Sequence, residues 1–201
     1  MSADLAAAAP VDIEEPRYGW VVVWATCVAL GVIFGVAYSF AAFFEPFVAE
    51  FKAQRADVSL VFGLCGAIYF VLGAFGGMLS DRLGPRVVVG AGMVCIAAGL
   101  LGAAVARSMI EVTLAYGVGV GLGIALVYTP AIGTVQPWFT RRRGLAAGIA
   151  SAGIGAGTLV VPLLATAAIA AWQWRGAMTA LAIGTLLLGV AAALLLKRAP
   201  A

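Results

Sequence analysis

The chain has 201 residues, of which 64% are hydrophobic and only 10% are charged, and its formal net charge is +3. A soluble domain carries roughly 25% charged residues, so this composition excludes a soluble fold and indicates an integral membrane protein. The chain has no histidine, which excludes histidine-ligated metal and histidine-based acid–base catalysis. We expect no metal, no cofactor and no nucleic-acid partner.

The chain begins with a polar stretch, residues 1–18, that carries four acidic residues, one arginine and two prolines. We expect a short flexible tail here, on the cytoplasmic side. The stretch lacks the basic start and the apolar core of a signal peptide.

Six apolar runs follow the tail. A bilayer core of about 30 Å needs roughly 20 apolar residues in helical form. The runs lack the polar alternation of a membrane barrel, so we predict an all-α membrane protein with six transmembrane helices in one bundle, residues 19–198. The predicted spans are about 20–44, 58–80, 87–106, 112–139, 144–171 and 176–196. Residues 199–201 are the C-terminal end, which we treat as a candidate truncation point.

Lysines and arginines in the predicted loops indicate the orientation of the chain. One side carries eight of them and the other side four, which predicts a multi-pass inner-membrane protein with both termini in the cytoplasm. The eight are Arg17, Arg82, Arg86, Arg141, Arg142, Arg143, Lys197 and Arg198. For the run Arg141–Arg143 two interpretations stay open, namely topology control and contact with anionic lipid or substrate.

Glycine is abundant, with 26 residues, and it gathers in two spans. "GVGVGLG" (117–123) lies in the fourth span and "GIASAGIGAG" (148–157) in the fifth. Small residues at three- and four-residue spacing let helix backbones approach closely, so we interpret both clusters as packing surfaces. No lysine followed by serine or threonine accompanies them, which argues against a phosphate-binding loop.

Two stretches suggest an internal repeat. The first span ends in "YSFAAFFEPF" (38–47) and the fourth in "YTPAIGTVQPWF" (128–139). Each has a tyrosine, a hydroxyl residue, an alanine, a proline and an aromatic residue in the same order. Two inverted three-helix repeats, which pair the first span with the fourth, would explain the pattern.

The turn between the second and third spans, "GGMLSDRLGPR" (76–86), concentrates charge in an otherwise apolar region. Asp81 follows the C-terminal end of a helix, where a carboxylate is unfavourable, so its favourable partner must lie elsewhere. Gly84 and Pro85 predict a tight reversal. The residues alone leave two readings open, a latch between moving bundles and an ordinary solvated loop.

The pattern Gly77-x-x-x-Asp81-Arg82-x-Gly84-x-Arg86 resembles the signature loop between helices two and three of the major facilitator superfamily. Pro85 departs from the pattern, since the family usually has a basic residue there. The stretches 17–47 and 138–157 are similar to the monocarboxylate transporters and the related oxalate–formate antiporters.

This resemblance implies the N-terminal six-helix half of a twelve-helix carrier, with a cavity lined by the first and fourth helices. It implies transport of a small monocarboxylate or dicarboxylate. Tyr38 stands where animal monocarboxylate transporters carry a lysine, as in bacterial oxalate–formate-like members, which argues against a lysine-based proton-coupling scheme. A coupling proton therefore stays open, as does the choice between symport and antiport. The cytoplasmic gating loop would be Gly77, Asp81, Arg82, Gly84 and Arg86.

By the same resemblance, Tyr38, Tyr128 and Gln136 are the candidate cavity residues. A phenol in a dry pocket can donate a hydrogen bond to a carboxylate while its ring packs on an apolar body. The alternative for both tyrosines is the aromatic belt at the membrane interface.

The spans contain no lysine, arginine, aspartate or glutamate at mid-membrane depth, although an anionic substrate would favour a fixed cation there. We therefore expect a partner, either a C-terminal six-helix half or a second copy of the chain. The alternative is a transport-inert truncated remnant or an accessory membrane subunit. We do not expect an enzyme, because the spans hold no histidine and no carboxylate pair.

Overall fold

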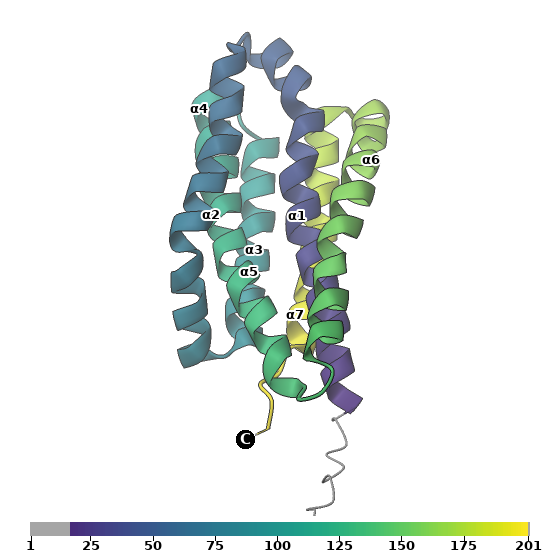
Figure 1. Cartoon of the computed structure of the whole chain (residues 1–201). Helices are drawn as coiled ribbons and strands as arrows, with labels where there is room; N and C mark the ends of the chain where they lie inside the picture. Colours follow the sequence, from purple (N-terminus) through teal and green to yellow (C-terminus); the bar gives the residue numbers. More distant parts are fainter. Residues whose placement is uncertain (1–16, 201) are drawn as a thin grey trace, which may run out of the picture.

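The computed structural model describes residues 17–200, and all of its regular elements in that range are helices (Figure 1). The predicted tail lies outside the described residues except for Arg17 and Tyr18, with which the first helix begins. Ala201, the last residue of the predicted C-terminal end, lies outside them as well.

Five helices are long and apolar enough to cross a membrane. They are α1 (Arg17–Phe51), α2 (Arg55–Leu83), α3 (Pro85–Ala104), a fourth helix (Met109–Trp138) and a fifth (Arg143–Leu195). The fourth is made of α4 (Met109–Val112), the π-helical η1 (Thr113–Val120), α5 (Gly121–Val135) and the short 3₁₀ turn η2 (Gln136–Trp138). The fifth is made of α6 (Arg143–Gly184), the π-helical η3 (Thr185–Gly189) and α7 (Val190–Leu195).

The fifth helix reverses direction at Gln173. With 53 residues it would be about 80 Å long if straight, far more than a bilayer core of about 30 Å. Gln173 has φ 60° and ψ 172°, outside the helical region, and the chain runs back along the bundle from there (Figure 1). The predicted spans 144–171 and 176–196 lie on either side of this turn. Six crossings remain a prediction, which the reversal supports.

The two ends of the described chain lie at the same end of the bundle. The Tyr18 hydroxyl, in the first turn of α1, donates a hydrogen bond to the carbonyl oxygen of Leu195 at the end of α7, at 2.9 Å. Figure 1 shows both ends at the bottom of the molecule. We call this the lower end, and the end that holds Gln173 the upper end.

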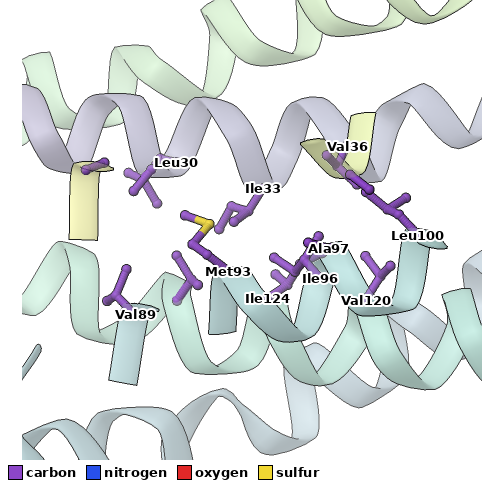
Figure 2. Close-up of a cluster of buried hydrophobic side chains, with 14 of the residues drawn as sticks. Leu30, Ile33, Val36, Val89, Met93, Ile96, Ala97, Leu100, Val120 and Ile124 are labelled. Atoms are coloured by element: carbon purple, nitrogen blue, oxygen red, sulfur yellow. The ribbon is translucent and has the colours of Figure 1, made fainter. Parts of the chain in front are cut away.

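The core is built by α1, α3 and the fourth helix. Figure 2 shows their apolar side chains meeting, with Ile33 of α1, Met93 and Ile96 of α3 and Ile124 of α5 among them. Each of these four side chains is at most 2% exposed. Because three helices contribute to one contiguous cluster, the bundle packs as a single body.

The glycines of 117–123 pack on two neighbours in alternation. A Cβ atom on Gly117 or Gly121 would crowd Val61, Leu64 or Cys65 of α2, whereas one on Gly119 or Gly123 would crowd Gly99 or Gly92 of α3. The spacing of four residues puts each pair on one face of the helix. The expected packing role of this cluster is therefore confirmed.

The helix contacts follow the pairing that the repeat predicts. The first half of α6 packs on α1, and α5 packs on α2. If the first span corresponds to the fourth and the second to the fifth, these two contacts are equivalent. Glycines make both of them: Gly153 and Gly157 of α6 lie against α1, and Gly76 of α2 lies against Ala125 of α5. This agreement supports the inverted repeat.

Candidate functional site

An aromatic cluster joins α1, α2 and α5 at half the height of the bundle. The ring of Phe34 lies 5.6 Å from the ring of Tyr128 and 6.5 Å from the ring of Tyr69, centre to centre. The rings of Tyr69 and Tyr128 are 6.5 Å apart. Phe34 is the middle residue of α1 and Tyr69 the middle residue of α2. The cluster therefore lies at the depth where a carrier would hold its substrate.

Tyr38 lies one helical turn above Phe34 on α1. Its side chain is 53% exposed, and its ring packs edge-on against Phe62 of α2 at 6.4 Å. The structure thus places Tyr38 beside the cluster, on the same two helices, but its ring contact is with Phe62 rather than with Tyr128.

Gln136 lies apart from both tyrosines. It is the first residue of η2, exposed, at the lower end of the fourth helix. Eight residues separate it from Tyr128, which is about 12 Å along a helix. The structure does not bring Gln136 into the aromatic cluster.

The five tyrosines of the chain fall into two groups by their hydroxyls. The Tyr18 hydroxyl donates to Leu195, and the buried Tyr116 hydroxyl donates to the carbonyl oxygen of Val36 at 3.1 Å. Within residues 17–200, the hydroxyls of Tyr38, Tyr69 and Tyr128 make no such hydrogen bond. Three phenols near mid-depth thus keep a donor available for a ligand.

The turn between α2 and α3 is a single residue long. Gly84 has φ 92°, which favours glycine, and its N–H donates to the carbonyl oxygen of Ser80 at 2.8 Å. Pro85 follows as the first residue of α3, where its fixed φ suits a helix start. The tight reversal expected from Gly84 and Pro85 is confirmed.

The charged residues of this turn are exposed. Asp81 contributes its backbone carbonyl oxygen to a hydrogen bond from Arg198, but its carboxylate makes no ion pair within the described part of the chain. Arg82 and Arg86 are exposed and likewise make no ion pair there. Neither neighbouring arginine is therefore the partner of the Asp81 carboxylate.

The turn is connected physically to the fourth helix. Gly77 lies so close to α5 that a Cβ atom there would be 3.0 Å from the Thr129 side chain. A pocket of about 460 Å³ separates the rest of the turn from the lower end of α5. Its lining includes Ser80 and Asp81 from the turn and Thr129 and Thr134 from α5. Thr129 directly follows Tyr128, so the turn and the aromatic cluster share a helix.

The basic run lies where η2 leads into α6. Arg141 and Arg142 are exposed in the connecting loop, and Arg143 is the first residue of α6. The Arg143 Nε donates to the carbonyl oxygen of Phe139 at 2.5 Å, which caps the preceding turn. The run lies at the lower end, together with Asp81 and Arg198.

A sequence comparison decides the family. The family model described as Major Facilitator Superfamily matches residues 18–201. The chain belongs to the major facilitator superfamily. It is therefore a multi-pass membrane protein, and the resemblance of the turn 76–86 to the signature loop of this superfamily is explained by membership.

Curated relatives place the chain near the monocarboxylate transporters of the superfamily. It is 36% identical to rat monocarboxylate transporter 13 over 161 residues, which cover 80% of this chain and 38% of that protein. It is 35% identical to mouse monocarboxylate transporter 11 over 186 residues, which cover 92% of this chain and 42% of that protein. The chain thus spans about two fifths of the length of these relatives. They are transporters, so the expectation that this member is not an enzyme is confirmed.

A solved major facilitator structure has the same fold. The crystal structure of a mutant peptide transporter POT in complex with alafosfalin superposes with a TM-score of 0.73 at 20% identity. The match covers 85% of this chain and 37% of the other. At this identity the likeness establishes the fold alone.

Sequence reasoning missed two residues of the aromatic cluster, Phe34 and Tyr69. Tyr69 has a signal that could have found it, because it stands in the middle of a 23-residue predicted span, far from either interface. Phe34 lies four residues before Tyr38, on the same face of α1. What the sequence does not contain is the crossing of α2 and α5 that brings Tyr69 to Tyr128.

Proposed function

We propose that this chain forms one six-helix bundle of a carrier that moves a small organic anion, a monocarboxylate or dicarboxylate, by alternating access. The observation that carries the proposal is the group of Tyr38, Tyr69 and Tyr128 near half the height of the bundle, whose hydroxyls make no hydrogen bond within residues 17–200. Their rings and Phe34 offer apolar surface beside hydrogen-bond donors, which suits a carboxylate on a small apolar body.

The relatives support the substrate class. They are named monocarboxylate transporters, and the mid-depth group in this chain contains donors but no acidic residue. A phenol donates to a carboxylate without itself adding a negative charge to the membrane interior. The depth of Tyr69 and Tyr128 also argues against the interfacial belt, where Tyr18 and Trp138 lie with their rings 5.6 Å apart.

A second bundle would complete the site. Residues 17–200 place no lysine or arginine at the depth of the cluster, so the cation that an organic anion favours would come from the partner. The face that carries α2 is open to such a partner, because Phe70, Val71 and Phe75 are 75%, 69% and 59% exposed. A C-terminal six-helix half or a second copy of the chain would cover it.

We place the lower end of the bundle on the cytoplasmic side of the inner membrane. The arginines of the turn 76–86, the run Arg141–Arg143 and Lys197 and Arg198 all gather there, as the positive-inside rule requires. In this orientation the turn with Asp81 faces the cytoplasm and can serve as the gating loop between two bundles.

Uptake of labelled carboxylates tests the proposal. Cells that express the chain in its native assembly should accumulate radiolabelled lactate, pyruvate or oxalate above the level of cells with an empty vector. Tyr128→Phe and Phe34→Ala should lower this uptake at unchanged abundance in the membrane. Trp172→Phe, an exposed residue at the upper end, serves as the control. Absence of uptake for every carboxylate would favour a transport-inert remnant or an accessory subunit.

A further inference from the structure

The segment that leaves the last helix, residues 195–199, is bound to three other helices at the lower end. We call it the exit segment. The Tyr18 hydroxyl of α1 donates to the carbonyl oxygen of Leu195 at 2.9 Å, and the Trp138 indole Nε1 donates to the carbonyl oxygen of Lys197 at 3.1 Å. Leu195 is the last residue of α7, where a helix leaves its carbonyls unpaired, and Lys197 lies just beyond the helix.

Aromatic contacts strengthen this attachment. The ammonium group of Lys197 lies 4.8 Å from the centre of the Tyr18 ring, a cation–π geometry. The side chain of Leu196 is fully buried. The backbone of the exit segment is therefore held against the lower ends of α1 and η2. This conformation determines where the next side chain, Arg198, points.

Arg198 binds the C-terminal end of α2. One nitrogen of its guanidinium group, Nη2, donates to the carbonyl oxygen of Ser80 at 2.8 Å and to the carbonyl oxygen of Asp81. The Ser80 carbonyl also accepts the N–H of Gly84, which closes the turn. The guanidinium group thus binds the Ser80 carbonyl that also takes part in the turn at Gly84.

The charge at this position has a clear physical effect. The C-terminal end of a helix carries partial negative charge, and the Asp81 carboxylate adds a full negative charge beside it. A cation hydrogen-bonded to the last carbonyls offsets the partial charge of the helix end. Arg198 therefore binds the backbone of α2, while the Asp81 carboxylate keeps no ion-pair partner within residues 17–200.

We propose that Arg198 is a positioning residue for the gating loop, which holds the end of α2 and presents the Asp81 carboxylate to the opposite bundle. It joins the second span to the last one, so that the two three-helix units of this bundle keep one arrangement at the cytoplasmic side. The importance of this arrangement for transport rests on the proposed function, whereas the attachment of α2 does not.

Hydrogen exchange tests the attachment without any substrate. In the purified chain in lipid nanodiscs, Arg198→Gln should speed exchange of the amides in residues 81–84 by roughly ten-fold, since it removes hydrogen bonds from a charged donor. Arg107→Gln removes an exposed arginine at the upper end and leaves these bonds in place, so exchange in residues 81–84 should stay close to that of the parent chain. Unchanged exchange in Arg198→Gln would overturn the proposal.

Transport tests the positioning role. Arg198→Gln should lower carboxylate uptake several-fold at equal abundance, and Arg198→Lys should restore only part of it, because an ammonium group lacks the planar geometry of a guanidinium. In an Asp81→Asn background, Arg198→Gln should add little further loss. Independent, multiplying losses would show that Arg198 does not act through Asp81 and would overturn the positioning role. If the parent chain moves no carboxylate, the proposed function fails, and hydrogen exchange alone decides whether Arg198 holds α2.

Discussion

Gly157 of α6 lies directly against Gly31 of α1, so closely that a Cβ atom on Gly157 would overlap the Gly31 carbonyl oxygen. Gly153, one turn earlier, meets Cys27 in the same way. Two turns of α6 thus rest on the backbone of α1 with no side chain between them. In a membrane, where lipid is as apolar as the side chains, such close packing is a main source of helix association.

Gly157→Ala should therefore destabilise the bundle. The added methyl group must push α6 away from α1, and overpacking of this kind costs about 1–3 kcal/mol. The midpoint of thermal unfolding in detergent measures the effect. Gly155→Ala is the matched control, because a Cβ atom on Gly155 meets nothing within 4 Å. It should leave stability unchanged or raise it by up to about 1 kcal/mol. Equal midpoints for the two variants would contradict the packing assigned to Gly157.

The contrast between Gly155 and Gly157 marks what the sequence could predict. Composition and hydropathy predicted helices and their approximate positions, because each apolar run had to bury its backbone polar groups in lipid. The run 148–157 predicted close packing, but a Cβ atom on Gly148 or Gly155 would meet nothing within 4 Å. Which glycines pack depends on where α6 crosses α1, and that crossing is a property of the whole bundle.

The predicted end of the first span shows a second limit. The apolar run of the first predicted span, 20–44, ends just before the charged residue Glu45, yet α1 continues to Phe51. Glu45 pairs with Arg55 at 2.6 Å, and Glu50 pairs with Arg175 at 3.1 Å. Both ion pairs lie on the part of α1 that extends beyond the apolar run. The sequence predicted the part of α1 that fits a bilayer, and contacts between distant residues determine the rest.

Arg175 joins three elements at the upper end. Its Nη1 donates to the carbonyl oxygens of Ala104 and Ala106, both at 2.9 Å, while its Nη2 contacts Glu50 and its guanidinium lies 4.2 Å from the centre of the Trp174 ring. The group therefore caps the C-terminal end of α3 and holds α1 beside the turn at Gln173.

We expect Arg175→Gln to lower the thermal midpoint clearly, because two carbonyls lose a charged donor. Arg175→Lys should recover only part of the loss, since an ammonium group cannot match the planar fork of the guanidinium. Arg107→Gln removes a nearby exposed arginine whose side chain makes no hydrogen bond within residues 17–200. Its midpoint should stay near that of the parent chain, and an equal drop would contradict the role given to Arg175.

The buried hydroxyl of Tyr116 offers a test of the core. Tyr116 is 1% exposed and donates to the Val36 carbonyl oxygen at 3.1 Å, across from η1 to α1. Tyr116→Phe should reduce stability by about 0.5–1.5 kcal/mol, the usual value for one hydrogen bond. Tyr38→Phe removes a hydroxyl that makes no hydrogen bond within the described residues, so the unfolding midpoint should not change. A larger loss for Tyr38→Phe than for Tyr116→Phe would be inconsistent with these contacts.

Asp81→Asn should separate transport from stability. The carboxylate lies at the C-terminal end of α2, where the helix dipole disfavours negative charge, so neutralising it should leave stability unchanged or raise it by about 0.3–1 kcal/mol. Carboxylate uptake should nevertheless fall, because the proposed latch loses its charge.

Asp57→Asn is the matched control on the same helix. Asp57 lies in the first turn, where a negative charge is favourable, and its Oδ2 accepts the Gln54 N–H at 3.2 Å. That variant should lose stability slightly and keep its uptake per molecule. A gating carboxylate is indicated if Asp81→Asn loses uptake without losing stability while Asp57→Asn loses stability without losing uptake. Parallel losses of abundance and uptake in Asp81→Asn would favour an ordinary loop charge.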